Sequence, residues 1–194
     1  MINIINKNIE QAKDSIAKLA NAKETIQSID LASRACSETI ANGGKLLICG
    51  NGGSAADSQH FAAELIGRFY FDRQPLPAIA LSTDSSILTC VGNDYSFSDI
   101  FSRQVQALCN KNDLVFGIST SGNSDNVMKA FDEAKKIGAK TLLLTGNKKG
   151  HLESISDIII PVPSSDTARI QEMHLLVEHT ICESIEIDLG IKPQ

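Results

Sequence analysis

Tryptophan is absent from this sequence, and no two of its cysteines are spaced as Cys-x-x-Cys. The missing Cys-x-x-Cys pairs exclude the usual motifs of zinc ribbons and thioredoxin-like redox sites. The five cysteines that are present, Cys36, Cys49, Cys90, Cys109 and Cys182, are odd in number and scattered. This pattern indicates reduced, mostly buried thiols, and we therefore expect a cytoplasmic protein.

Long apolar runs and an excess of basic residues are absent as well. No run approaches the roughly 20 apolar residues that a membrane-spanning helix needs, and the N-terminus is too polar for a signal peptide. With 18 Lys and Arg against 23 Asp and Glu, the net charge is −5, which argues against the basic face of a nucleic-acid-binding protein. We expect neither a membrane nor a nucleic acid as partner, whereas a small anion can still bind at helix ends.

The phosphate-binding motifs of nucleotide-binding proteins are also missing, since neither G-x-x-x-x-G-K-[ST] nor a G-x-G-x-x-G that opens a βαβ unit occurs. The chain is organised instead around a junction between an apolar segment, Leu114–Ile118, and the hydroxyl residues Ser119, Thr120, Ser121 and Ser124. Helical spacing of apolar residues follows directly. Backbone N–H groups, the positive end of that helix and the hydroxyls would converge on a phosphate. An ordinary strand-to-helix turn with a serine N-cap is the alternative.

A second junction of the same kind lies earlier in the chain. The apolar segment 45–49 leads into Asn51, Gly52, Gly53 and Ser54, after which a helix is expected over about 55–69. Glycines at such a turn let the backbone approach a ligand closely. Because ligands of parallel sheets bind at the carboxyl ends of the strands, we expect both turns to face one site.

Five short apolar segments alternate with helical patterns and predict the fold class, an α/β protein whose five-stranded parallel sheet carries helices on both faces. We expect one domain over 1–194, strands at 45–49, 78–81, 114–118, 141–145 and 157–162, a turn at 92–94 and a closing helix at 167–188. The two N-terminal helices, within 1–42, exceed a minimal α/β core. A partner subunit would cover their apolar stripes, or they fold back on their own domain.

Polar residues that could bind a metal or transfer a proton lie on two of the predicted helices. His60 and Glu64 are four residues apart and share a helix face. Gln171 and His179 are eight apart on the last helix, so their directions differ by only about 80°. A histidine and a glutamate on one face suit a metal site or an acid/base pair. The same spacing is equally that of a surface i,i+4 polar pair.

Five segments, in order along the chain, carry a family resemblance: Cys49–Ser54, His60–Glu64, Val91–Asp94, Gly117–Ser124 and Arg169–His174. Together they resemble the sugar-isomerase (SIS) domain and, within it, the phosphoheptose isomerase family. The resemblance extends from the second helix to the end of the chain. It implies a flavodoxin-like SIS domain and a homotetramer with sites formed between subunits.

The resemblance also implies an activity and the residues for it. The activity is conversion of sedoheptulose 7-phosphate to D-glycero-D-manno-heptose 7-phosphate, for the heptose of bacterial lipopolysaccharide core or capsule. One zinc ion per subunit is implied on His60, Glu64, Gln171 and His179, with Glu64 and His179 as the acid/base pair acting through an enediolate. The substrate contacts implied are Asn51, Gly52, Gly53, Ser54, Glu64, Asn93, Asp94, Ser119, Thr120, Ser121, Ser124 and Gln171.

Three other interpretations fit parts of the sequence. A non-catalytic adaptor with the same fold, the replication-initiator-associating protein, has similar segments but lacks the side chains that correspond to Glu64 and His179. A ligand-sensing SIS domain usually accompanies a basic DNA-binding segment, which the first forty residues do not resemble. Another phosphosugar isomerase is also compatible, because a phosphate cradle does not define the length of the sugar.

Overall fold

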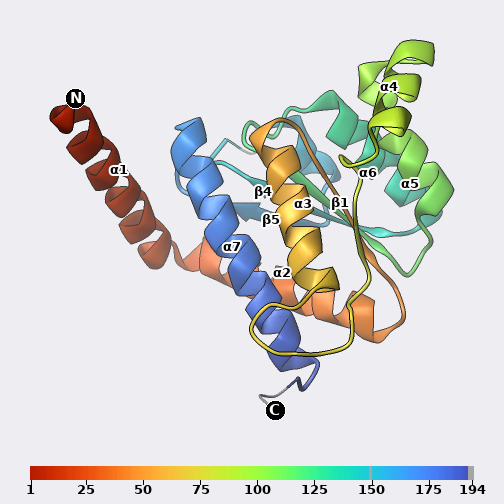
Figure 1. The fold of residues 1–194 in the computed structure, drawn as a ribbon, viewed down its shortest axis with the longest axis horizontal. Helices are drawn as coiled ribbons and strands as arrows, with labels where there is room; N and C mark the ends of the chain where they lie inside the picture. The colour runs from red at the N-terminus through yellow and green to blue at the C-terminus, as the bar shows by residue number, and fades with distance from the viewer. Residues whose placement is uncertain (149, 192–194) are drawn as a thin grey trace.

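The computed structural model describes residues 1–148 and 150–191, and its centre is a five-stranded, all-parallel sheet (Figure 1). The strands are β1 (Leu46–Gly50), β2 (Ala78–Ala80), β3 (Leu114–Ser119), β4 (Lys140–Thr145) and β5 (Ile158–Pro161). Their order across the sheet is β2-β1-β3-β4-β5, which is the flavodoxin order. The predicted fold class is confirmed, and Pro161 lies on an edge strand, where a missing N–H is tolerated.

The helices match the predicted pattern with local differences. They are α1 (Ile2–Asn21), α2 (Lys23–Ala41), α3 (Gly53–Ile66), α4 (Ser85–Asp94), α5 (Ser102–Leu108), α6 (Asp125–Ile137) and α7 (Thr167–Asp188), with 3-10 turns η1 (Phe97–Asp99) and η2 (His151–Ile155). The predicted turn at 92–94 is wrong, because α4 continues to Asp94 and the Tyr95 N–H still bonds to the Val91 carbonyl. In the part of the chain described, no helix is long and apolar enough to cross a membrane.

Successive residues of the central strands pack into two separate cores. Leu46 and Ile48 of β1 pack into a core under α2, α3 and α7, whereas Leu47 and Cys49 pack into a second core under α4, α5 and α6. This alternation follows from the pleat of a strand. Both faces of the sheet are therefore covered by helices, as Figure 1 shows, and the interiors of β1, β3 and β4 are apolar.

The sheet has its topological switch point between β1 and β3. These neighbouring strands pair in parallel over their whole length, and Gly50 at the end of β1 lies beside Ile118 of β3. The chain leaves β1 to form α3 over one face and leaves β3 to form α6 over the other. Ligands of parallel sheets bind beside such a point, at the carboxyl ends of the strands, and both predicted turns lie there.

The two N-terminal helices behave differently. α2 buries Ala32, Ala35 and Cys36 against the sheet. α1 extends away from the body beyond α7 (Figure 1) and buries only Ser15 and Leu19 among its residues. The isoleucines of α1 are more than half exposed, namely Ile2, Ile4, Ile5, Ile9 and Ile16. α1 thus keeps an uncovered apolar stripe.

Candidate active site

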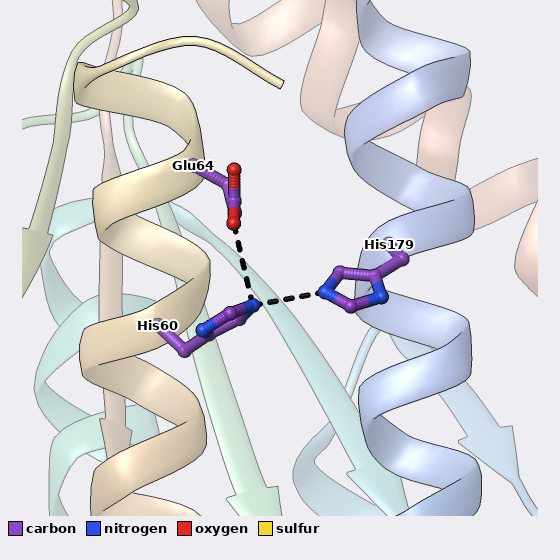
Figure 2. A group of neighbouring side chains, drawn as sticks. All are labelled: His60, Glu64 and His179. Atoms are coloured by element: carbon purple, nitrogen blue, oxygen red, sulfur yellow. Dashed lines mark hydrogen bonds and ion pairs between the residues drawn. The ribbon is translucent and has the colours of Figure 1, made fainter. Parts of the chain in front are cut away.

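Three side chains from two helices converge, as Figure 2 shows. His60 and Glu64 project from α3 and His179 projects from α7. The Nε2 atom of His60 lies 2.9 Å from Nε2 of His179 and 3.4 Å from Oε1 of Glu64. The surface-pair interpretation of His60 and Glu64 is therefore incomplete, because a residue 119 positions away joins them.

The packing of α3 against α7 creates this convergence. Phe61 and Leu65 of α3 are fully buried in the same core as Ile181 and Cys182 of α7. His60 and Glu64 each precede one of these buried residues, so they lie at the margin of the packed face. They remain reachable from solvent, since the side chains of His60 and Glu64 are 44% and 26% exposed. A small molecule can therefore reach the cluster.

The donor atoms of the cluster suit a divalent metal ion. One donor atom from each of His60, Glu64 and His179 lies within 4.8 Å of the others. Two imidazole nitrogens and a carboxylate oxygen are typical zinc ligands, and catalytic zinc sites use three protein ligands and one open position. Ligand atoms around tetrahedral zinc are roughly 3.3 Å apart, which is close to the two distances around the His60 Nε2 atom. The residues present therefore fit such an ion.

Gln171 lies at a different level of the same pair of helices. Its amide nitrogen would be 2.1 Å from a Cβ atom added at Gly53, so the amide fills the space beside that glycine. Gly53 opens α3, seven residues before His60. Gln171 therefore reaches the turn after β1 rather than the three-residue cluster, and its assignment as a fourth metal ligand stays a prediction. Contact with a substrate at that turn is also within its reach.

The turn after β3 gathers hydroxyl and backbone N–H groups into what we call the cradle. Ser119 and Ser124 bring their hydroxyls within 2.9 Å of each other, and the Gly122 N–H donates to Ser119 Oγ. Ser124 occupies the N-cap position of α6, yet its side chain accepts no capping hydrogen bond from the described backbone. The N-cap alternative thus fails in its usual form. The N–H groups at the start of α6 are left available for an anion.

The turn after β1 lies next to this cradle. The side chains of Asn51 and Asn126 exchange two amide hydrogen bonds of 2.8 Å, which tie the first turn to α6. Gly52, the N-cap residue of α3, has φ +58°, a backbone conformation that favours glycine. Ser54 is buried at the start of α3. The expectation that both turns face one site agrees with this arrangement.

Asn93 and Asp94 are farther along the chain from these groups, in the last turn of α4. Both are exposed, and the Asn93 amide donates to the Asp94 carboxylate at 2.8 Å. Within the described residues, no hydrogen bond or ion pair joins either side chain to the cluster or to the two turns. Their predicted contact with a substrate stays a prediction.

α7 also buries two titratable side chains near the cluster. His174 and Glu178 are 0% exposed, and their nitrogen and oxygen atoms have no hydrogen-bond partner within the described chain. Burial lowers the pKa of His174 to about 4. Burial, with the negative charge of Asp57 as a second cause, raises the pKa of Glu178 to about 9. Both side chains are therefore neutral near pH 7.

Two features beside the cluster were not predicted from the sequence, namely an aromatic ring next to His179 and a buried ion pair next to that ring. The ring of Phe69, just after α3, lies 5.4 Å from the ring of His179. Behind it, Arg73 and Glu186 form a buried ion pair. One signal was available, because Glu186 continues the i, i+4 line of α7 through the buried Cys182. An acidic residue on a buried helix face needs a partner.

Known proteins with this sequence pattern and fold were identified by comparison. The SIS domain family matches residues 5–146. Phosphoheptose isomerase of Aliarcobacter butzleri is 54% identical over 92% of this chain and 93% of its own length. That of Helicobacter pylori (strain ATCC 700392 / 26695) is 50% identical over 95% of both chains.

Solved structures agree with these relatives. A phosphoheptose isomerase from Francisella tularensis superimposes with a TM-score of 0.92 at 41% identity, covering 96% of this chain and 98% of that one. The phosphoheptose isomerase from Neisseria gonorrhoeae gives a TM-score of 0.90 at 38% identity, covering 95% and 98%. The convergent cluster, the two turns and these likenesses together lead to one conclusion: the chain is an isomerase of the SIS domain family and belongs, within it, to the phosphoheptose isomerases.

Proposed function

We propose that this enzyme converts sedoheptulose 7-phosphate to D-glycero-D-manno-heptose 7-phosphate and so supplies heptose for bacterial lipopolysaccharide core or capsule. The observation that carries the proposal is the convergence of Glu64 and His179, which come from distant parts of the chain. The names of the relatives support a heptose phosphate as substrate. The hydroxyl and N–H groups of the cradle after β3 support a phosphorylated substrate.

The chemistry is a transfer of the carbonyl from C2 to C1. Glu64 takes a proton from C1 of the ketose, and the same proton or one from solvent is later returned to C2. His179 moves a proton from the oxygen on C1 to the oxygen on C2 by way of the enediolate intermediate. A carboxylate and an imidazole beside each other suit these two roles. One proton leaves carbon and one arrives, so no redox partner is needed.

The phosphate end of the substrate would lie at the turns. In this proposal Ser119, Thr120, Ser121 and Ser124 contact the phosphate together with the first N–H groups of α6. The substrate contacts proposed at the first turn and beyond are Asn51, Gly52, Gly53, Ser54, Asn93, Asp94 and Gln171. A phosphate held at the cradle would leave C1 and C2 directed toward the cluster.

The proposed cofactor is one zinc ion per subunit. His60, Glu64 and His179 would hold it, and Gln171 is proposed as a further ligand. Zinc would polarise the carbonyl oxygen and stabilise negative charge that develops on it. The donor set of the cluster supports this proposal.

We also propose that the enzyme is a homotetramer. The exposed isoleucines of α1 form an apolar stripe, and a second copy of the chain would remove it from water. Light scattering should give about four times the chain mass of 20.9 kDa. An Ile5→Lys, Ile9→Lys protein should assemble less completely. A monomeric wild-type protein at micromolar concentration would contradict the proposal.

The function is tested by incubating the purified enzyme with sedoheptulose 7-phosphate and following the aldose product by NMR. We expect product to form, and a chelator to reduce the rate until zinc is restored. Fructose 6-phosphate in a parallel incubation tests sugar length. Absence of any aldose from sedoheptulose 7-phosphate, with zinc present, would reject the substrate assignment and favour an adaptor or another phosphosugar.

A further inference from the structure

A buried ion pair lies next to the candidate active site. Arg73 Nε and Glu186 Oε1 are 2.8 Å apart, and the two side chains are 3% and 0% exposed. A buried pair of this kind often stabilises a fold no better than apolar residues of similar size would. Stability alone is therefore a weak reason for its presence, and its further contacts suggest another.

Arg73 is bonded to the helix end that carries Glu64. Its Nη2 atom donates to the backbone carbonyl of Glu64 at 2.9 Å, and its Nη1 atom donates to that of Leu65 at 2.8 Å. These carbonyls belong to the last turn of α3, where helix carbonyls lack partners within the helix. A guanidinium group has the planar geometry to bond two carbonyls at once. Arg73 thus fixes the backbone of Glu64.

Glu186 is hydrogen-bonded to the segment 69–71, which lies beside His179. It lies seven residues, about two turns, after His179 on α7. Its carboxylate accepts the N–H groups of Phe69, Tyr70 and Phe71 at 3.1, 3.1 and 3.3 Å. These three bonds hold the segment 69–71 on α7, where the Phe69 ring lies against the His179 ring.

We infer that Arg73 and Glu186 are positioning residues, whose ion pair sets the separation of Glu64 and His179 by clamping the end of α3 to α7. The inference rests on the proposed function for its kinetic consequence, although its structural consequence stands without it. A misplacement of about 1 Å in a catalytic group can lower turnover by up to about 100-fold. Loss of the clamp should therefore reduce kcat more than it changes KM.

The main test replaces Glu186 by Gln. An amide group of the same shape keeps one acceptor, but it points N–H groups at backbone donors and leaves Arg73 without a counter-charge. Asp113→Asn is the matched control, because the Asp113 carboxylate is also fully buried and accepts two backbone N–H groups and a lysine. It lies at the amino ends of the strands, opposite the site.

Both variants should unfold at lower temperature than the wild type. In assays well below both unfolding temperatures, Glu186→Gln should lower kcat about 10- to 100-fold with KM within about threefold. Asp113→Asn should retain kcat within about twofold. Equal kcat losses in the two variants would mean that the pair acts only through stability, and would overturn the inference.

A second variant and a second measurement keep the test decisive. Arg73→Lys preserves the charge opposite Glu186, but its single ammonium nitrogen cannot reproduce the planar fork by which Nε, Nη1 and Nη2 of Arg73 bond three separate partners. It should therefore show the same kcat loss, and it replaces Glu186→Gln if that variant does not fold. The visible spectrum of Co²⁺ added to metal-free protein reports the geometry of the His60, Glu64 and His179 donors. We expect this spectrum to change in both clamp variants and not in Asp113→Asn.

The outcomes separate the two proposals. A wild-type enzyme without isomerase activity would reject the proposed function, while the Co²⁺ spectra would still test the clamp. Clamp variants with wild-type kcat and a wild-type Co²⁺ spectrum would reject the clamp and leave the proposed function intact.

Discussion

The two faces of the sheet bury polar side chains in different ways. Under α5 and α6 the core is apolar, and the buried amide of Gln104 donates to the carbonyls of Leu81 and Ile100. Under α3 and α7 the imidazole of His174 and the carboxyl of Glu178 have no hydrogen-bond partner among the residues described. Proteins depart from good local packing mainly where function requires it. The face that buries His174 and Glu178 is also the one that carries the candidate catalytic cluster.

The largest effect should come from the cluster itself. His179→Gln keeps the size of the side chain but cannot carry a proton at neutral pH. We expect kcat to fall about 10²- to 10⁴-fold, the usual contribution of an acid/base group, and stability to change little because the side chain is half-buried. Glu38→Gln, at the exposed end of α2, is the control and should leave kcat unchanged. A His179→Gln enzyme with more than a tenth of wild-type kcat would contradict the assigned role.

The opposite face should respond through stability alone. Phe131 of α6 is fully buried against Gly117, where a Cβ would lie only 2.6 Å from its ring. Phe131→Ala should cost about 3–5 kcal/mol of unfolding free energy, measured by urea denaturation. The kcat of the remaining folded enzyme should stay near that of the wild type at low temperature. A large loss of kcat without loss of stability would contradict the claim that this face acts through stability alone.

Replacement of Glu178 should raise the unfolding free energy, whereas Phe131→Ala lowers it. Its buried carboxyl has no partner in the described structure, so an unbranched apolar side chain should be better tolerated there. Glu178→Met should raise the unfolding free energy by about 1–3 kcal/mol at pH 7.5, measured by urea denaturation. A clear loss of stability would mean that the carboxyl has a partner, such as an internal water, that stabilises it.

His174 should make the fold sensitive to acid. Its pKa is about 4 in the folded chain and near 6.5 when unfolded, so the unfolded chain binds a proton more readily between these values. The stability that His174 provides is therefore present above pH 6.5 and lost as the pH falls toward 4. Against His174→Leu, wild type should lose roughly 1–2 kcal/mol between pH 7 and pH 5.

This comparison at each pH removes the contribution of Glu178, which is the same in both proteins. The difference between wild type and His174→Leu should be constant if His174 is protonated equally in the folded and unfolded chains. A constant difference would contradict the burial of a neutral imidazole. Thermal unfolding monitored by circular dichroism at four pH values is sufficient.

The sequence predicted the elements well because their signals are local. The helix predicted over 167–188 has the same bounds as α7, and the alternation of strands and helices correctly predicted the parallel sheet. The turn at 92–94 failed because glycine, asparagine and aspartate also occur in the last turn of a helix. In the candidate site, spacing placed His60 beside Glu64 but could not bring His179 to them. That contact depends on how α7 packs on α3.

The sequence indicated that Glu186 needs a partner but, for the same reason, not which residues the clamp joins. Nothing near Arg73 indicates that its guanidinium bonds the carbonyl of Glu64, and nothing near Phe69 indicates a partner 117 residues later. The likeness to a family supplied the site residues, and the packing supplied the residues that hold them.

Proton exchange in deuterated water tests the central claim most directly. Wild-type enzyme should introduce deuterium at C1 of sedoheptulose 7-phosphate or at C2 of the aldose during turnover, as seen by NMR. A Glu64→Gln enzyme, verified as folded, should introduce deuterium at neither carbon above the uncatalysed rate. Exchange at the wild-type rate by the Glu64→Gln enzyme would contradict the assignment of Glu64 as the base that takes the substrate's proton.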